Sequence, residues 1–206
     1  MKIRLCCKDQ GTLVAFAILI CLIVGCAEST QKPVIVYEIV ELTTTMGNIT
    51  LRLNRSRAPI SVENFLDYVK SGFYDSTVVH RVIKDIIIQG GQYTTDLSMK
   101  DTNEPIVCES DNGLSNLRGT IAVARKNDPD TGTSQFFINL VDNIILDWRD
   151  NQNAIGYAVF GSVIEGMDVV DAIAAVPTST HQTPDGTDLN NVPDTPVIVL
   201  SARHIE

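Results

Sequence analysis

The chain has 206 residues, of which 44% are hydrophobic and 20% are charged. This composition supplies enough apolar side chains for a sizeable core and is not typical of a disordered protein. A formal net charge of -9 argues against nucleic acid as a partner, although acidity alone names no substrate.

The first 25 residues have the pattern of an export signal. Three basic residues near the start precede an apolar run, Thr12 to Val24, which is shorter than the roughly 20 apolar residues that a membrane-spanning helix needs. The run leads into Ile23-Val24-Gly25-Cys26, which resembles the processing site of bacterial lipoproteins. We therefore predict a signal peptide over residues 1–25, a lipidated Cys26 and a tether over residues 26–36. An uncleaved anchor and an ordinary secretory signal are the alternatives.

A lipid on Cys26 would hold the protein at a membrane, facing the periplasm. Ala27 rather than aspartate follows this cysteine, which in enterobacterial-type sorting favours the outer membrane over the inner one. Apart from Cys26, the only cysteine outside the predicted signal peptide is Cys108. A single thiol forms neither an internal disulfide nor a zinc site, so we expect Cys108 to be a small, partly buried apolar residue.

The chain after the tether is rich in strand patterns. Tyr37 to Thr45 and Ile49 to Leu53 alternate around a short turn and predict a β-hairpin. Pro59 then starts an amphipathic helix with apolar residues at i, i+3, i+4 and i+7, and Gly72 ends it.

Six more short strands and one more helix are expected. The strands are Val78–Ile83, Ile86–Gln89, Gly119–Ala124, Gln135–Leu140, Tyr157–Ile164 and Pro196–Ala202. The second helix covers Met167 to Ala175. Thr178 to Asp194 is predicted to be the least regular stretch, with a turn at Pro184-Asp185-Gly186. Many short strands and two helices favour one mainly all-β domain over residues 37–206, a closed antiparallel barrel with helices over its ends.

Arg81 and Gln89 lie four residues on either side of Asp85. In a tight hairpin these two side chains would lie opposite one another, with Cβ atoms about 4.5–5.5 Å apart. A guanidinium beside an amide, backed by Phe137, can hold a planar peptide group by its carbonyl oxygen and its nitrogen. On the residues alone, an arginine that only pairs with a nearby carboxylate or carbonyl is an equal alternative. His80 should point to the opposite face of its strand and have a structural role.

Other catalytic patterns are missing from the sequence. The three histidines, His80, His181 and His204, have no metal-binding spacing, no glycine-rich loop opens a helix, and no serine lies in a Gly-x-Ser-x-Gly turn. These observations argue against a hydrolase or a metalloenzyme, and we expect neither a metal site nor a cofactor.

Several motifs, in order along residues 38–205, resemble the cyclophilin-type peptidyl-prolyl cis–trans isomerases. The matching stretches are Val79-His80-Arg81-Val82-Ile83, Ile88-Gln89-Gly90-Gly91, Thr133-Ser134-Gln135-Phe136-Phe137-Ile138-Asn139, Pro59 to Phe65, Gly72-Phe73-Tyr74, Gly119 to Arg125 and Gly156 to Gly161. The resemblance implies an eight-stranded barrel capped by two α-helices. It also implies a monomer that needs no cofactor and accelerates rotation about X–Pro bonds in proline-containing polypeptides.

The resemblance assigns roles to individual residues. Arg81 would donate a hydrogen bond to the proline nitrogen as the amide twists, and Gln89 would help to orient the carbonyl. The proline pocket would consist of Ile86, Ile87, Phe137, Ile145, Leu146 and Tyr157. The groove for the residues that precede proline would consist of Val123, Ala124, Arg125 and Gln135.

Ile86 and Ile145 depart from the family pattern, which has aromatic rings at both positions in most members. A ring contact with proline is worth about 0.5–1.5 kcal/mol beyond the buried area. We therefore expect an isomerase of reduced activity that assists the folding of periplasmic or outer-membrane proteins. The alternative is a low-activity scaffold that binds proline-containing segments as a chaperone or adaptor. Whether Trp148 folds back into the site is open.

Overall fold

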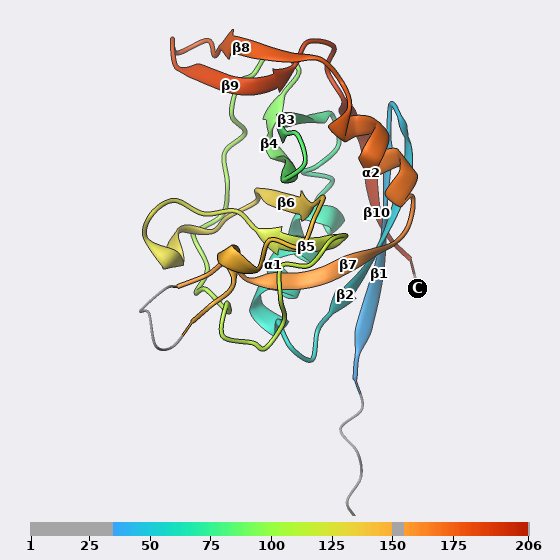
Figure 1. Ribbon diagram of the computed structural model, residues 1–206, viewed down its shortest axis with the longest axis vertical. Coiled ribbons are helices and arrows are strands. Elements are labelled where there is room, and N and C mark those ends of the chain that lie inside the picture. Colours follow the sequence, from blue (N-terminus) through green and yellow to red (C-terminus); the bar gives the residue numbers. More distant parts are fainter. Residues whose placement is uncertain (1–34, 150–154, 206) are drawn as a thin grey trace, which may run out of the picture. The chain divides into compact units, whose positions relative to one another are not determined.

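Eight strands close into an antiparallel barrel in the computed structural model, which describes residues 35–149 and 155–205 (Figure 1). Around the barrel the order is β1-β10-β3-β4-β6-β5-β7-β2. The strands are β1 Tyr37–Thr44, β2 Gly47–Asn54, β3 Thr77–Ile83, β4 Ile87–Thr94, β5 Thr120–Val123, β6 Phe136–Asn139, β7 Val159–Glu165 and β10 Ile198–Ile205. The predicted fold, a closed eight-stranded barrel with two α-helices, is confirmed.

Helix α1, Pro59–Lys70, begins and ends where the sequence indicates. Its apolar stripe is buried, and its first turn is capped from a distant loop: the Glu109 carboxylate accepts from the backbone nitrogens of Ile60, at 3.0 Å, and Ser61, at 2.7 Å. A carboxylate at this end also offsets the positive end of the helix dipole. Gly72, with φ of +68°, lets the chain turn away after the last helical turn.

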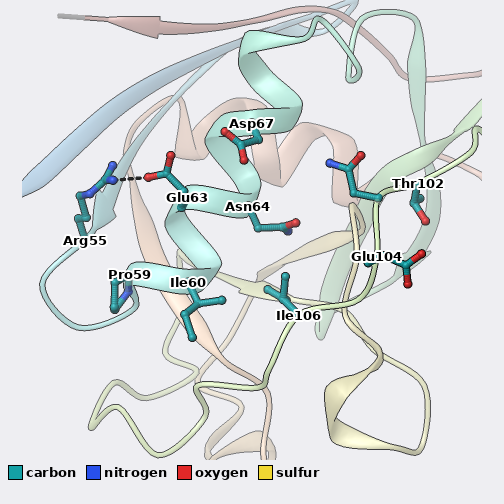
Figure 2. Close-up of a pocket in the computed structure, with 10 residues that line it drawn as sticks. Arg55, Pro59, Ile60, Glu63, Asn64, Asp67, Thr102, Glu104 and Ile106 are labelled. Carbon is teal, nitrogen blue, oxygen red and sulfur yellow. Dashed lines mark hydrogen bonds and ion pairs between the residues drawn. The ribbon is translucent and has the colours of Figure 1, made fainter.

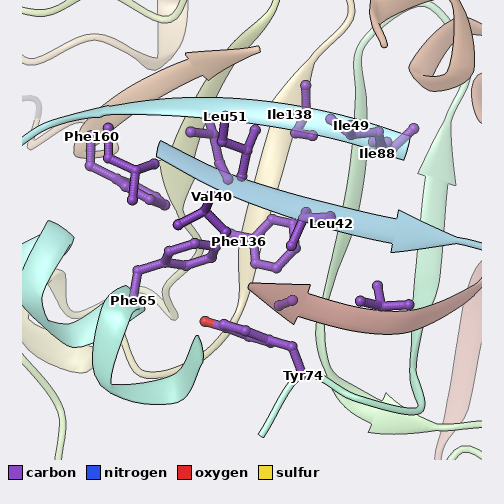
Figure 3. Packing of buried hydrophobic residues seen from close by; sticks show 14 of the residues in the cluster. Val40, Leu42, Ile49, Leu51, Phe65, Tyr74, Ile88, Phe136, Ile138 and Phe160 are labelled. Atoms are coloured by element: carbon purple, nitrogen blue, oxygen red, sulfur yellow. The ribbon is translucent and has the colours of Figure 1, made fainter. Parts of the chain in front are cut away.

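The core fills the barrel and the space beneath α1. Figure 3 shows aromatic rings of α1, β6 and β7 meeting the aliphatic side chains of β1 and β2. Phe65 lies edge-on to Phe136, with ring centroids 5.6 Å apart, and Tyr74 donates its hydroxyl to the Ser134 carbonyl at 2.9 Å. Helix α2, Met167–Ala174, buries Val170 and Ile173 in the same cluster.

The stretch from Thr178 to Asp194 is regular, and the prediction that it is not was wrong. It forms a hairpin of β8, Thr178–Gln182, and β9, Asp188–Pro193, beside the barrel (Figure 1). The predicted turn is present, since the Gly186 nitrogen donates to the Thr183 carbonyl at 2.9 Å. β8 has no buried residue, so the alternation of apolar and polar residues that identifies a strand is absent.

A few apolar residues attach this hairpin to the barrel. Leu189 and Val192 of β9 pack with Val78 of β3 and with Leu97. Backbone pairing and this small cluster therefore stabilise a segment whose composition is that of a loop.

The predicted signal peptide, Cys26 and most of the predicted tether lie outside the described residues. No helix within the described ranges is long and apolar enough to cross a membrane.

Candidate active site

The hairpin of β3 and β4 places Arg81 opposite Gln89, as predicted. Arg81 Nη1 donates to Gln89 Oε1 at 3.3 Å. The connecting turn is tight: the Ile86 nitrogen donates to the Ile83 carbonyl at 3.0 Å, and Asp85 takes a positive φ of 60°. Aspartate tolerates this conformation better than most residues, so the turn fixes the register of the pair.

Arg81 keeps most of its hydrogen-bonding capacity. A guanidinium has five N–H donors, and the Arg81 side chain is exposed. Among residues 35–149 and 155–205, none of the ion pairs includes Arg81. Of the alternative that this arginine only pairs with a carboxylate or a carbonyl, the carboxylate half is not supported; Arg81 does donate to the Gln89 side-chain carbonyl, and donors remain for a ligand.

The strand register continues this pair into an apolar surface. Gln89 pairs with Phe137 of β6, Phe137 with Ala122 of β5, and Ala122 with Val159 of β7. Residues that are paired directly across strands lie on one face of a sheet. Arg81, Gln89, Phe137, Ala122 and Val159 thus form a single row across five strands, polar at one end and apolar at the other. We call it the cross-strand row.

Most of the predicted proline pocket lies at the apolar end of this row. Ile87 and Phe137 are buried in one cluster, and Leu146 and Tyr157 pack against it partly exposed. The Phe137 and Tyr157 rings meet edge to face, with centroids 5.5 Å apart. The sequence did not indicate four further members of the cluster, which are Ile83, Leu114, Ala122 and Val159.

Two isoleucines and one tryptophan near the pocket lie at its exposed edge or beyond it. Ile86 is 42% exposed, Ile145 is 76% exposed and Trp148 is 42% exposed, and none belongs to the buried cluster. Contact of Ile86 and Ile145 with a proline ring stays a prediction. Trp148 does not fill the pocket in place of the missing rings.

Buried asparagines hold the rim of the pocket, and sequence reasoning missed them. Asn143 Nδ2 donates to the Ile86 carbonyl and to Asn139 Oδ1, at 2.9 and 2.8 Å. Asn116 Nδ2 donates to the Leu146 carbonyl at 3.2 Å. A polar residue at the end of the apolar run of β6 is the one signal that could have indicated such a network.

The predicted groove residues divide into three kinds. Ala124 packs on the pocket cluster, and Gln135 accepts from Gln89 Nε2 at 2.8 Å. Val123 instead packs in the barrel core and is only 9% exposed, because β5 alternates and Ala122 takes the outward position. Arg125 lies over the Tyr157 ring, 4.6 Å from its centroid, and donates from Nε and Nη2 to the Gly156 carbonyl, so it anchors one wall of the groove.

Comparison with known proteins agrees with this arrangement. The family described as "Cyclophilin type peptidyl-prolyl cis-trans isomerase/CLD" matches residues 39–203. The chain belongs to this family. It is 50% identical over 165 residues to "Peptidyl-prolyl cis-trans isomerase A" of Dickeya dadantii, covering 80% of this chain and 83% of that one. It is 47% identical over 136 residues to "Peptidyl-prolyl cis-trans isomerase B" of Escherichia coli, covering 66% of this chain and 83% of that one.

A solved structure shares the fold. The cyclophilin-type isomerase cgd2_1660 of Cryptosporidium parvum superimposes with a TM-score of 0.67 at 24% identity, covering 83% of this chain and 99% of that one. The chain is therefore a cyclophilin-type peptidyl-prolyl cis–trans isomerase in family, fold and activity.

A wide groove elsewhere on this cyclophilin is not the candidate active site. It has a volume of about 930 Å³ and lies between α1 and the segment 102–106 (Figure 2). Its lining mixes charged and amide side chains with Pro59, Ile60 and Ile106, and its Glu63 is paired with Arg55. It shares no residue with the cross-strand row.

His80 lies behind the catalytic face, as predicted. Its ring is 4% exposed and lies 4.6 Å from that of Tyr93, measured between centroids. Burial, and then the positive charge of Arg81, lower the pKa of His80 to about 4, while the Val78 carbonyl and the Gln135 side chain act in the opposite direction. His80 is therefore neutral in the folded protein at neutral pH.

This burial predicts acid sensitivity. Between pH 6.5 and pH 4 the unfolded chain binds a proton on His80 that the folded protein does not bind, so stability falls as the pH is lowered through that range. From pH 7 to pH 5 the His80 contribution to the free energy of unfolding should fall by about 2 kcal/mol. Urea titrations of wild type and His80→Gln at both pH values measure it. Equal pH dependence in the two proteins would contradict the assignment.

Proposed function

We propose that the cross-strand row is the active site and that it catalyses X–Pro rotation in exported polypeptides. The observation that carries this proposal is the register of Arg81, Gln89 and Phe137 on three neighbouring strands. It puts a donor for the amide beside an apolar surface for the proline ring. This division matches the two halves of an X–Pro unit, which are polar at the peptide group and apolar at the ring.

Rotation about the amide needs no bond to be broken. Resonance sets a barrier of about 18–20 kcal/mol, because the nitrogen lone pair is delocalised into the carbonyl. As the amide twists, that lone pair returns to the proline nitrogen. A donor positioned there stabilises the twisted state more than either planar state, and this difference lowers the barrier. Arg81 is the exposed donor of the row and takes this role in the proposal.

Gln89 and the pocket hold the substrate while it turns. The Gln89 oxygen keeps the guanidinium of Arg81 in place through the bond of 3.3 Å. The ring of proline would rest on Phe137 with Leu146 and Tyr157 around it, so that the segment before the proline rotates. A solved cyclophilin of Cryptosporidium parvum, with a TM-score of 0.65 to this chain, was determined in the presence of the dipeptide Ala-Pro, which supports Ala–Pro peptides as probes.

The proposal includes a lipid anchor and a place of action outside the cytoplasm. Its support is the sequence alone: a basic start, the apolar run Thr12 to Val24, and Cys26 after Ile23-Val24-Gly25. In this proposal the protein works as a monomer, tethered by Cys26 to the periplasmic face of a membrane, with the outer membrane favoured.

Radiolabelled palmitate incorporation and membrane fractionation in a Gram-negative host test this part. Full-length wild type should be labelled and sediment with membranes, whereas Cys26→Ser should be unlabelled and leave the outer-membrane fraction. Cys108→Ser is the matched control and should behave as wild type. An unlabelled wild type would refute the anchor and leave the isomerase proposal standing.

The scaffold alternative rests on Ile86 and Ile145, which the family resemblance assigns to the pocket as aliphatic side chains where most members have rings, and both are exposed. If these side chains limit the rate, Ile86→Phe or Ile145→Trp should each raise kcat/KM for an Ala–Pro peptide by up to about tenfold. Leu200→Phe, on β10 and outside the pocket cluster, adds a ring without touching the pocket and should change nothing. No gain from either pocket variant would show that the missing rings do not set the rate.

A further inference from the structure

Three glutamines connect Arg81 to a backbone carbonyl through an unbroken series of hydrogen bonds. Arg81 Nη1 donates to Gln89 Oε1 at 3.3 Å, and Gln89 Nε2 donates to Gln135 Oε1 at 2.8 Å. Gln135 Nε2 donates to Gln92 Oε1 at 2.6 Å, and Gln92 Nε2 donates to the Lys100 carbonyl at 3.3 Å. We call this series the amide relay.

The two ends of the amide relay fix its direction. A guanidinium can only donate and a backbone carbonyl can only accept, whereas a side-chain amide does either, depending on how it is turned. Turning any one of the three amides over would place an acceptor against an acceptor on one side and a donor against a donor on the other. The Lys100 carbonyl therefore determines which way Gln92 faces, and Arg81 and Gln92 together determine which way Gln89 and Gln135 face.

An irregularity in β4 brings Gln92 to this position. In a regular strand, Gln89 and Gln92 would point to opposite faces. The pairing of β3 with β4 passes from Val79↔Gly90 to Thr77↔Thr94, so that three residues of β4, 91–93, lie opposite Val78 alone and β4 has two extra residues. Gly91 has φ of +100°, and a Cβ there would lie 2.7 Å from the Ser134 carbonyl oxygen. The bulge at Gly91 turns Gln92 toward Gln135.

We propose that Gln92 is a positioning residue of the isomerase: it holds the amide relay in the direction that keeps the Gln89 oxygen facing Arg81. This inference rests on the proposed roles of Arg81 and Gln89. Gln92 contacts neither Arg81 nor the pocket cluster. Without it, the direction of Gln89 is held from the Arg81 end alone, so Gln135 turns over more readily and Gln89 with it, and an NH₂ group then replaces the oxygen that orients the guanidinium.

The first test removes the Gln92 amide, which joins the amide relay to the Lys100 carbonyl, and keeps the side-chain length. Gln92→Met should lower kcat for an Ala–Pro peptide roughly threefold to tenfold and leave KM unchanged, because the donor is present but less well oriented. Gln92→Glu should recover part of the loss, since a carboxylate still accepts from Gln135 Nε2. Gln182→Met, in the β8–β9 hairpin, is the matched control with wild-type kcat.

The second test reverses one unit of the relay. Gln89→Glu is an acceptor only, so Gln135 must turn its NH₂ toward it and oppose its oxygen to that of Gln92. Combining Gln89→Glu with Gln92→Met removes this conflict. The double variant should therefore keep a higher kcat than the product of the two single effects, and a purely additive result would overturn the relay.

The outcomes separate this inference from the proposal beneath it. If Arg81→Ala loses activity while Gln92→Met retains the wild-type kcat, the relay is wrong and the active site stands. If Arg81→Ala also retains the wild-type kcat, the active-site assignment itself fails. A Gln92→Met variant that loses thermal stability and kcat together, with no recovery in Gln92→Glu, would show a structural role only and overturn the positioning role.

Discussion

Replacing Arg81 with alanine is expected to lower kcat/KM for an Ala–Pro peptide by about 10²- to 10³-fold, because it removes a donor that faces developing charge in the twisted state. Arg81 is exposed at the polar end of the cross-strand row and is held by Gln89. Nothing covalent happens in the reaction, so stabilisation of the twisted amide is the main contribution that the protein can make. A protease-free peptide isomerisation assay on purified protein measures the loss.

Two further variants make this result specific. Arg52→Ala removes another exposed guanidinium and should leave kcat/KM at the wild-type value. Arg52 lies on β2, and its guanidinium stacks over the Tyr37 ring of β1. Arg81→Lys keeps the charge but not the planar fork, so it should recover only part of the activity. Full activity in Arg81→Ala would mean that the row binds substrate without providing the catalytic donor.

The second large effect is expected from Phe137→Ala. The Phe137 ring is 2% exposed and lies against Tyr157, and truncating such a ring costs about 3–5 kcal/mol of stability. This is a large part of the stability of an ordinary domain, which is about 5–15 kcal/mol. Urea unfolding should show a lower midpoint with an unchanged slope.

Leucine substitutions separate the fold from the site. Phe137→Leu replaces a buried ring in β6, and Phe160→Leu replaces one in β7. Only Phe137 belongs to the pocket cluster. Both should lose stability, and only Phe137→Leu should lower kcat/KM among molecules that remain folded. An equal loss of kcat/KM in both variants would show that the effect comes from packing in general.

The sequence was sufficient for the features that depend on regular local geometry. The hairpin of Arg81 and Gln89 follows from alternation on both sides of a turn at Asp85, and the structure has that register. Helix α1 follows from Pro59, an apolar stripe and Gly72. In each case, a single periodic pattern and a turn or cap residue agree with the tertiary packing.

The features that were missed depend on irregular backbone or on tertiary contacts. Gln92 reaches the site only because of the bulge at Gly91, and a regular period of two places it on the wrong face. Asn143 supports the pocket through the Ile86 carbonyl, a contact between distant segments. In the β8–β9 hairpin, β8 buries no residue and β9 buries only its last two, so the side chains show no alternating strand pattern.

The central claim is that the cross-strand row catalyses rotation, in addition to holding a proline-containing segment. Exchange NMR on an Ala–Pro peptide measures both properties in one sample, because line positions report binding and cross-peaks report cis–trans exchange. Free in solution, the exchange takes tens to hundreds of seconds. Wild type should accelerate the cis–trans exchange enough for exchange cross-peaks to appear. Arg81→Ala should bind the peptide with similar affinity but leave its exchange at the uncatalysed rate. A wild-type protein that binds the peptide and leaves its exchange unchanged would contradict the account and favour the scaffold.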